Sequence, residues 1–157
     1  MTAYSDAIDE AYEKLSAKLG RELSSDEIEE LEGRLLQSWV GAGRFKELVE
    51  YAQDEFELQD GEAFCTSLGN LLCKVGEVAL ANELFRRLAQ AREAAFWRVW
   101  PKAQLGHIGL MKEAAIHLAN AMKSLAELYR CYAAVGDEQG KNRVKAEMLR
   151  LQDRRRE

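Results

Sequence analysis

The chain has 157 residues, of which 47% are apolar and 31% charged, and its formal net charge at pH 7 is −5. This length and composition exclude disorder over most of the sequence and predict one domain spanning residues 1–157. A negative net charge lacks the basic footprint of general nucleic-acid binding, so we expect no nucleic-acid partner. A single proline among many Ala, Leu, Glu, Lys and Arg residues predicts an all-α fold.

The N-terminal half predicts five helices. Apolar residues recur on one helical face from Tyr4 to Leu19, and Gly20 follows as a stop. Ser24 and Glu27 form a capping-box pattern that begins the second helix. We expect the first helix over residues 1–20, the second from 24 to the glycines at 41 and 43, and the third from about 45 to Asp60-Gly61. The fourth is capped by Asp60 and continues up to Val75. The fifth begins at about residue 78.

The C-terminal half is less regular. The ring of Pro101 disfavours the α conformation at Trp100, so we expect a boundary or kink there and a short helix over 102–107. Residues 110–135 contain neither glycine nor proline, yet Ser124 and Glu127 repeat the capping-box pattern, which predicts a break near residue 123. A final helix over 137–152 should cap the fold, with a frayed tail at 153–157. The total is about seven to nine helices.

An internal repeat underlies this order. Gly43, Gly76 and Gly109 are spaced by 33 residues, and Gly136 follows 27 later. The positions one, four and eight residues before each of these four glycines are apolar with one helix-breaking exception, Pro101. A period of 33 predicts stacked helix–turn–helix units over residues 24–136.

The best-formed unit resembles the tetratricopeptide repeat. Its Leu68-Gly69 pair, Leu72, Gly76, Ala81 and Phe85 stand where that motif has its Leu-Gly pair, large apolar residue, turn glycine and small and aromatic residues. The other units depart from the motif; Pro101 and Lys102, for example, replace the Leu-Gly pair in the third. The resemblance covers about residues 29–150 and implies an α-solenoid, a tetratricopeptide-like array of antiparallel helix pairs.

The resemblance also implies a binding face. In tetratricopeptide proteins, first-helix residues line a concave groove that binds segments of other proteins. Carried over by register, the lining would include Gln37, Val40, Thr66, Asn70, Lys74, His107 and Arg130. The paired Lys and Asn of grooves that clamp a C-terminal carboxylate are missing.

The cysteines and histidines suggest no chemistry. Cys65, Cys73 and Cys131 are odd in number and form no CxxC, and no basic-then-apolar leader begins the chain, so we expect reduced thiols in the cytoplasm, with Cys65 and Cys73 as core filler. His107 and His117 have no partner at metal-ligand spacing and should be surface or boundary residues, with no metal or cofactor.

Nothing in the sequence nominates an enzyme. No Ser, Cys or Thr has a recognisable base partner, and there is no phosphate-binding glycine loop. No run of about 18 apolar residues predicts a transmembrane helix, so no membrane partner is expected. The tryptophans Trp97 and Trp100 beside Pro101 could anchor a partner, although core packing is the simpler interpretation.

The sequence therefore favours a non-enzymatic adaptor or chaperone that holds a segment of another protein in its groove. Length, acidity and residues 24–51 are also similar to the small tetratricopeptide chaperones of bacterial type III secretion. The alternative is an inhibitor or immunity-type protein that blocks a toxin or enzyme by surface complementarity. Residues 1–62 have net charge −11 and residues 63–157 have +6, so the acidic N-terminal helices would provide that surface, unless they are simply solvated.

Overall fold

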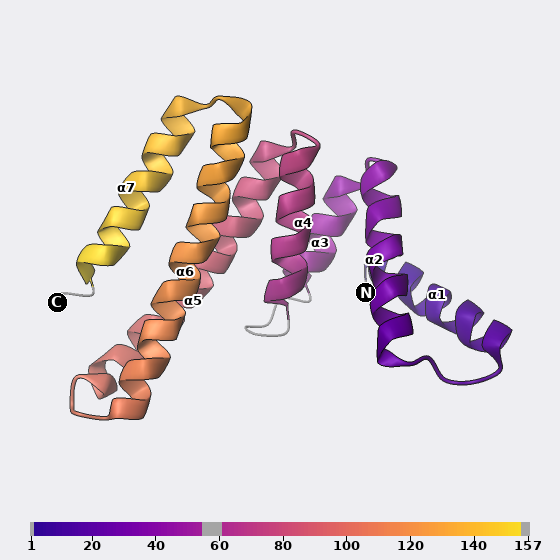
Figure 1. Ribbon diagram of the computed structural model, residues 1–157, viewed down its shortest axis with the longest axis horizontal. Helices are drawn as coiled ribbons and strands as arrows, with labels where there is room; N and C mark the ends of the chain where they lie inside the picture. Colours follow the sequence, from indigo (N-terminus) through magenta and orange to yellow (C-terminus); the bar gives the residue numbers. More distant parts are fainter. Residues whose placement is uncertain (1, 55–60, 155–157) are drawn as a thin grey trace. The chain divides into compact units, whose positions relative to one another are not determined.

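The computed structural model describes residues 2–54 and 61–154. Within these residues the chain is all-α, as predicted, with seven helices and no strand (Figure 1). The helices are α1 Ala3–Leu19, α2 Ser25–Gly41, α3 Phe45–Asp54, α4 Glu62–Lys74, α5 Val78–Ala103, α6 Ile108–Val135 and α7 Glu138–Arg154. The chain divides into two compact units, residues 1–56 and 57–157, which we call unit 1 and unit 2. None of the described helices is both long enough and apolar enough to cross a bilayer.

Local sequence signals set the helix ends of unit 1. The Ser24 hydroxyl accepts the Glu27 backbone N–H at 3.3 Å while the Glu27 carboxylate accepts the Ser24 N–H at 3.1 Å, which confirms the predicted capping box. Gly20 ends α1 in the left-handed conformation, with φ of 68°. The predicted cap Asp60 and the predicted end of the third helix fall outside the described residues.

An aromatic cluster holds unit 1 together where α1, α2 and α3 meet. The Tyr4 ring is 1% exposed and lies edge-on against Trp39 and Tyr51, with centroids 5.0 and 4.8 Å away. The guanidinium of Arg44 covers the Trp39 ring at 3.5 Å from its centroid. Burial is therefore concentrated at the N-terminal end of α1 and the C-terminal end of α2.

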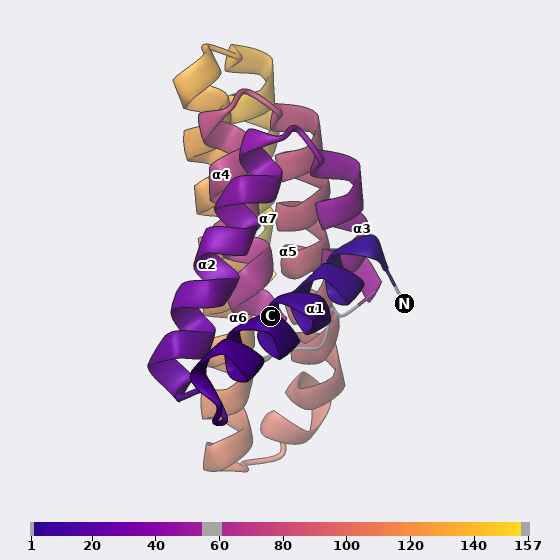
Figure 2. The same ribbon diagram turned by 90° about the vertical axis from the view of Figure 1, so that its right-hand side faces the viewer.

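Unit 2 is built around a long antiparallel hairpin of α5 and α6, which run side by side in both views (Figures 1 and 2). Helix α4 packs on α5, and α7 packs on α6. The fully buried side chains come from all four helices and include Leu68, Leu72, Leu84, Phe85, Leu88, Phe96, Leu118, Leu128, Val144 and Leu151.

Each outer helix of unit 2 approaches its neighbour at a glycine. A Cβ on Gly69 of α4 would lie 2.6 Å from the Phe85 ring of α5, and one on Gly140 of α7 would lie 2.4 Å from the Tyr132 ring of α6. The ring in each pair fills the space that a side chain on the facing helix would need. The Leu68-Gly69 and Phe85 pattern thus marks a true helix–helix contact.

The path near Pro101 agrees with the prediction only in part, because a helix end lies close to Pro101 but the short helix does not form. Helix α5 contains Pro101 and ends two residues later at Ala103, where the Trp100 carbonyl accepts the Gln104 N–H at 3.0 Å. The predicted helix over 102–107 is absent. A single turn joins the two long helices instead.

Helix α6 is also continuous where a break was predicted near residue 123. Ser124 and Glu127 lie inside it, and the buried stripe runs through Ala121, Leu125 and Leu128 without interruption. A capping-box pattern therefore gave a false signal here, because the flanking residues are strong helix formers and both sides of Ser124 are held by packing.

The turn glycines correct the predicted register. Gly43, Gly76 and Gly136 have positive φ, but Gly109 is helical and the third turn uses Gly106, with φ of 98°. Gly106→Ala should lower the free energy of unfolding by about 1 kcal/mol or more, because an L side chain is strained at that φ.

Gly109→Ala is the matched control, since a Cβ there meets nothing within 4 Å. It should be neutral or slightly stabilising in a helix. Denaturant unfolding of the two variants measures the difference, and equal losses would contradict the turn at Gly106.

Candidate partner-binding surfaces

The predicted groove residues of unit 2 lie on α4 and α6. Thr66, Asn70 and Lys74 recur every four residues along α4, with Lys74 exposed and the other two partly buried. Arg130 is exposed on α6 and pairs with Glu127 at 3.0 Å. Lys74 follows Cys73 and Arg130 precedes Cys131 in the sequence. Because these two cysteines are bonded to each other, the two cations lie in one region.

Within unit 2, His107 does not join that region. His107 is the N-cap of α6, and 22 helical residues separate it from Arg130, which is about 33 Å along the helix. Gln37 and Val40 belong to unit 1, where Gln37 is exposed and Val40 is 8% exposed within the core. Val40 therefore contributes little surface to any groove.

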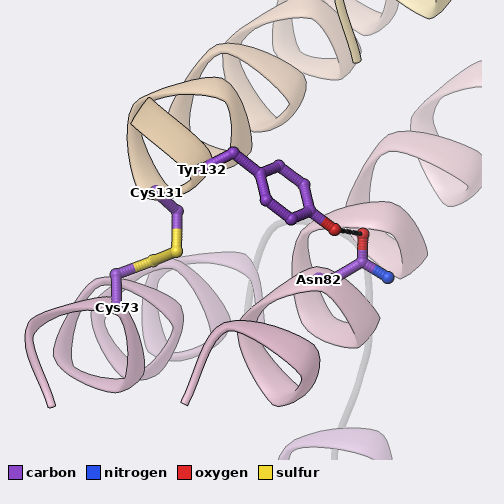
Figure 3. The surroundings of a disulfide bond; sticks show 4 residues. All are labelled: Cys73, Asn82, Cys131 and Tyr132. Carbon is purple, nitrogen blue, oxygen red and sulfur yellow. Dashed lines mark hydrogen bonds between the residues drawn. A yellow bond between two sulfur atoms is a disulfide. The ribbon is translucent and has the colours of Figure 1, made fainter. Parts of the chain in front are cut away.

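The link between α4 and α6 is a disulfide. Cys73 and Cys131 have Cα atoms 5.5 Å apart and are bonded, and the neighbouring Tyr132 hydroxyl donates to the Asn82 side chain at 2.9 Å (Figure 3). The prediction of three reduced thiols is thus wrong for two of them, and Cys73 is not core filler. The cysteine argument for a cytoplasmic location loses its premise, because structural disulfides persist mainly in oxidising compartments.

Cys65 is the remaining thiol, and it fits the prediction of core filler. It is 2% exposed, and burial raises its pKa to about 11. Native protein without reductant should therefore show almost no thiol reactive toward a disulfide reagent near neutral pH, since the thiolate is the reacting form. Denatured protein should release one reactive thiol before reduction and three after it; three before reduction would contradict the bond.

A buried ionic cluster connects α4, α5 and α6. Arg92, 7% exposed, donates from Nε and Nη2 to the Glu62 carboxylate, at 3.1 and 2.6 Å, and contacts His117 Nδ1 from Nη1 at 2.8 Å. Because a guanidinium is only a donor, His117 accepts at Nδ1 and its neutral ring carries the proton at Nε2, 3.6 Å from Glu113. His117 is therefore buried, at 9% exposed, and is not the surface or boundary residue that was predicted.

This cluster stabilises the fold, because its charged groups are paired with one another. Its guanidinium is occupied by protein groups, and among the described residues no three His, Cys, Asp or Glu side chains could hold a metal ion. His107 lies far from His117 at the exposed start of α6.

An open cleft in unit 1, which we call the α1–α2 cleft, lies along the C-terminal half of α1 and the loop that follows it, with Ile28 contributing the α2 side. Burial decreases along α1 from Tyr4 to Leu19, which is 41% exposed, and along α2 it increases from a half-buried Ile28 toward Trp39. Two adjoining hollows of about 640 and 320 Å³ occupy this splayed end and share Tyr12, Ser16 and Glu22. The remaining lining residues are Glu13, Ala17, Gly20, Arg21, Leu23 and Ile28.

The rim of this cleft is acidic. Arg21 is neutralised by two hydrogen bonds to Glu27, at 2.7 and 3.2 Å, which hold the pKa of that carboxyl at about 2. The Tyr12 hydroxyl donates to Glu32 across the two helices, and burial followed by that carboxylate raises the pKa of Tyr12. Glu13 and Glu22 remain exposed at the opening.

No family model, curated protein or solved structure matches the chain.

The cleft and the disulfide were both missed by sequence reasoning. The stripe from Tyr4 to Leu19 gave the apolar face of α1 but not how far α2 would cover it. The odd cysteine number and the lack of a CxxC motif gave no signal for a bond between Cys73 and Cys131, which are 58 residues apart. One sequence feature could have indicated the cleft: the apolar face of the first helix lies within residues 1–62, whose net charge is −11, so an apolar site with acidic residues around it was to be expected there.

Proposed function

We propose that the chain is a non-enzymatic protein-interaction module, an adaptor or chaperone, that holds a segment of a partner protein. The observation that carries the proposal is the α1–α2 cleft, where apolar side chains line two open hollows beneath an acidic rim. An open surface that combines apolar and charged groups in this way suits contact with one face of a protein segment. The segment it suits has an apolar face flanked by Lys or Arg.

The tetratricopeptide resemblance extends this proposal to unit 2. The Gly69–Phe85 and Tyr132–Gly140 contacts support α4–α5 and α6–α7 as two helix pairs of that kind, joined by unusually long inner helices. In this view Thr66, Asn70, Lys74 and Arg130 form a second, basic contact region on α4 and α6.

Charge reversal tests the cleft. Glu13→Lys with Glu22→Lys should weaken capture of a partner purified from the native cell by about tenfold or more, since both exposed carboxylates line the opening. The matched control is Asp9→Lys with Glu29→Lys, which makes the same charge change at exposed positions outside the cleft. Equal loss in both pairs would assign the effect to net charge and exclude the cleft.

A second variant locates the basic region. Asn70→Glu, Lys74→Glu and Arg130→Glu together should reduce capture if the partner also contacts α4 and α6. Unchanged affinity there, with loss in the cleft variant, would confine the site to unit 1.

The acidic rim also favours one alternative, an inhibitor or immunity-type protein that neutralises a basic toxin or enzyme. A tight equimolar complex with a folded protein, weakened strongly by salt, would favour the inhibitor. Weaker binding to unfolded or peptide segments would favour the chaperone.

A further inference from the structure

The end of the α5–α6 hairpin projects beyond the other helices of unit 2. At about 1.5 Å per residue, α5 and α6 with 26 and 28 residues are about 40 Å long, against about 20 and 25 Å for α4 and α7. In both views the hairpin extends past the ends of its neighbours at the turn over residues 104–107 (Figures 1 and 2). Side chains at this end therefore have few helices to pack against.

Large apolar side chains are concentrated at that end. Leu105 and Ile108, in and beside the turn, are 80% and 72% exposed, and Met111 is 47% exposed. One and two turns back along α5 stand Trp100, half-buried, and Trp97, 38% exposed. The indoles of Trp100 and Trp97 pack on the buried Phe96 ring, with centroids 5.2 and 5.1 Å away, so Phe96 holds both tryptophans in place.

The same end is predominantly basic. Residues 94–112 contain no Asp or Glu, whereas Arg98, Lys102 and Lys112 all lie there and are exposed. Ordinary solvated helix surface mixes both signs of charge, as unit 2 does elsewhere. With the exposed Glu113 next along α6, this apolar end has three cations and one carboxylate, and its net positive charge is complementary to a negatively charged apolar medium.

We propose that the end of the α5–α6 hairpin is a peripheral docking site for an anionic lipid surface. The residues are ordered by depth: Leu105 and Ile108 at the extremity would enter the acyl boundary, and the tryptophans would lie at headgroup level. Arg98, Lys102 and Lys112 would meet lipid phosphates. A peripheral contact of this kind needs no membrane-spanning helix.

The convex shape distinguishes this site from the α1–α2 cleft. The most exposed apolar residues protrude from the turn, an arrangement suited to insertion into a surface rather than to enclosing a segment. The site belongs to unit 2 and the cleft to unit 1, so each can fail independently of the other.

Vesicle flotation tests the proposal with the full chain. Vesicles containing one quarter phosphatidylglycerol in phosphatidylcholine should carry the protein, whereas pure phosphatidylcholine vesicles should not. Arg98→Gln, Lys102→Gln and Lys112→Gln together should weaken partition by about 100-fold, and Leu105→Ser with Ile108→Ser by a similar factor. Quenching by brominated acyl chains should reach tryptophan in the wild type and decrease in the serine variant.

Matched variants keep the test specific. Lys123→Gln, Arg143→Gln and Lys145→Gln remove three exposed cations of unit 2 away from the hairpin end, and Val135→Ser with Leu149→Ser removes two exposed aliphatic residues. Both controls should bind vesicles like the wild type. No binding to anionic vesicles, or equal loss in the controls, would overturn the proposal. An acidic protein captured through Leu105 and Ile108 without vesicle binding would assign the site to that partner instead.

Discussion

Replacing Cys73 and Cys131 with alanine should lower the free energy of unfolding by about 4 kcal/mol. The bond closes a loop with a sequence separation of 58. A cross-link of that span lowers the conformational entropy of the unfolded chain, which raises its free energy by about 4 kcal/mol. It also fastens α4 directly to α6, two helices that otherwise share few contacts because α5 lies against both. Equilibrium unfolding by denaturant without reductant measures the loss.

Reductant provides the internal control. The wild type should fall to the stability of the double variant when a strong dithiol is added, while the double variant should not respond. Cys65→Ala changes a buried thiol outside the bond, so it should cost about 1 kcal/mol from its small cavity and remain sensitive to reductant. A wild type whose stability is the same with and without reductant would contradict the disulfide.

The sequence was sufficient wherever a few neighbouring residues decide the structure. The capping box at Ser24 and Glu27, the helix stop at Gly20 and the turn at Gly76 were all predicted, because each depends on backbone groups within four residues. Gly69 and Phe85 were singled out by the resemblance to the tetratricopeptide motif, and the structure places them in contact. Local signals thus gave the element order up to Val78.

Sequence reasoning failed where packing overrides a local signal. Pro101 and the pattern at Ser124 both resemble helix boundaries, yet α5 and α6 pass through them because each helix buries a continuous apolar face against the other. Disulfide connectivity depends on which helices become neighbours, which spacing alone does not give. The α1–α2 cleft depends on how far two helices splay, and the pattern of one helix does not contain that angle.

The second large effect is expected at Arg92. Arg92→Met should lower the free energy of unfolding by about 3 kcal/mol, since removing one member of a buried ionic cluster leaves the Glu62 carboxylate without its guanidinium and His117 Nδ1 without its donor. The value lies at the low end for such clusters because the Glu62 side chain is 20% exposed and water can partly solvate the carboxylate. Denaturant unfolding of the variant measures the loss.

Two comparisons show whether burial of the charge is the cause. Arg130→Met breaks the exposed ion pair with Glu127, where the arginine side chain is 73% exposed, and should cost about 0.5 kcal/mol or less. Adding Glu62→Gln to Arg92→Met should recover part of the loss, because the side chain that has lost its guanidinium is then neutral and needs less solvation. If Arg92→Met costs no more than Arg130→Met, the cluster contributes nothing beyond a surface pair. If Glu62→Gln makes the loss larger, the loss of stability in Arg92→Met comes from the packing of the arginine stem and not from the charge of the Glu62 carboxylate.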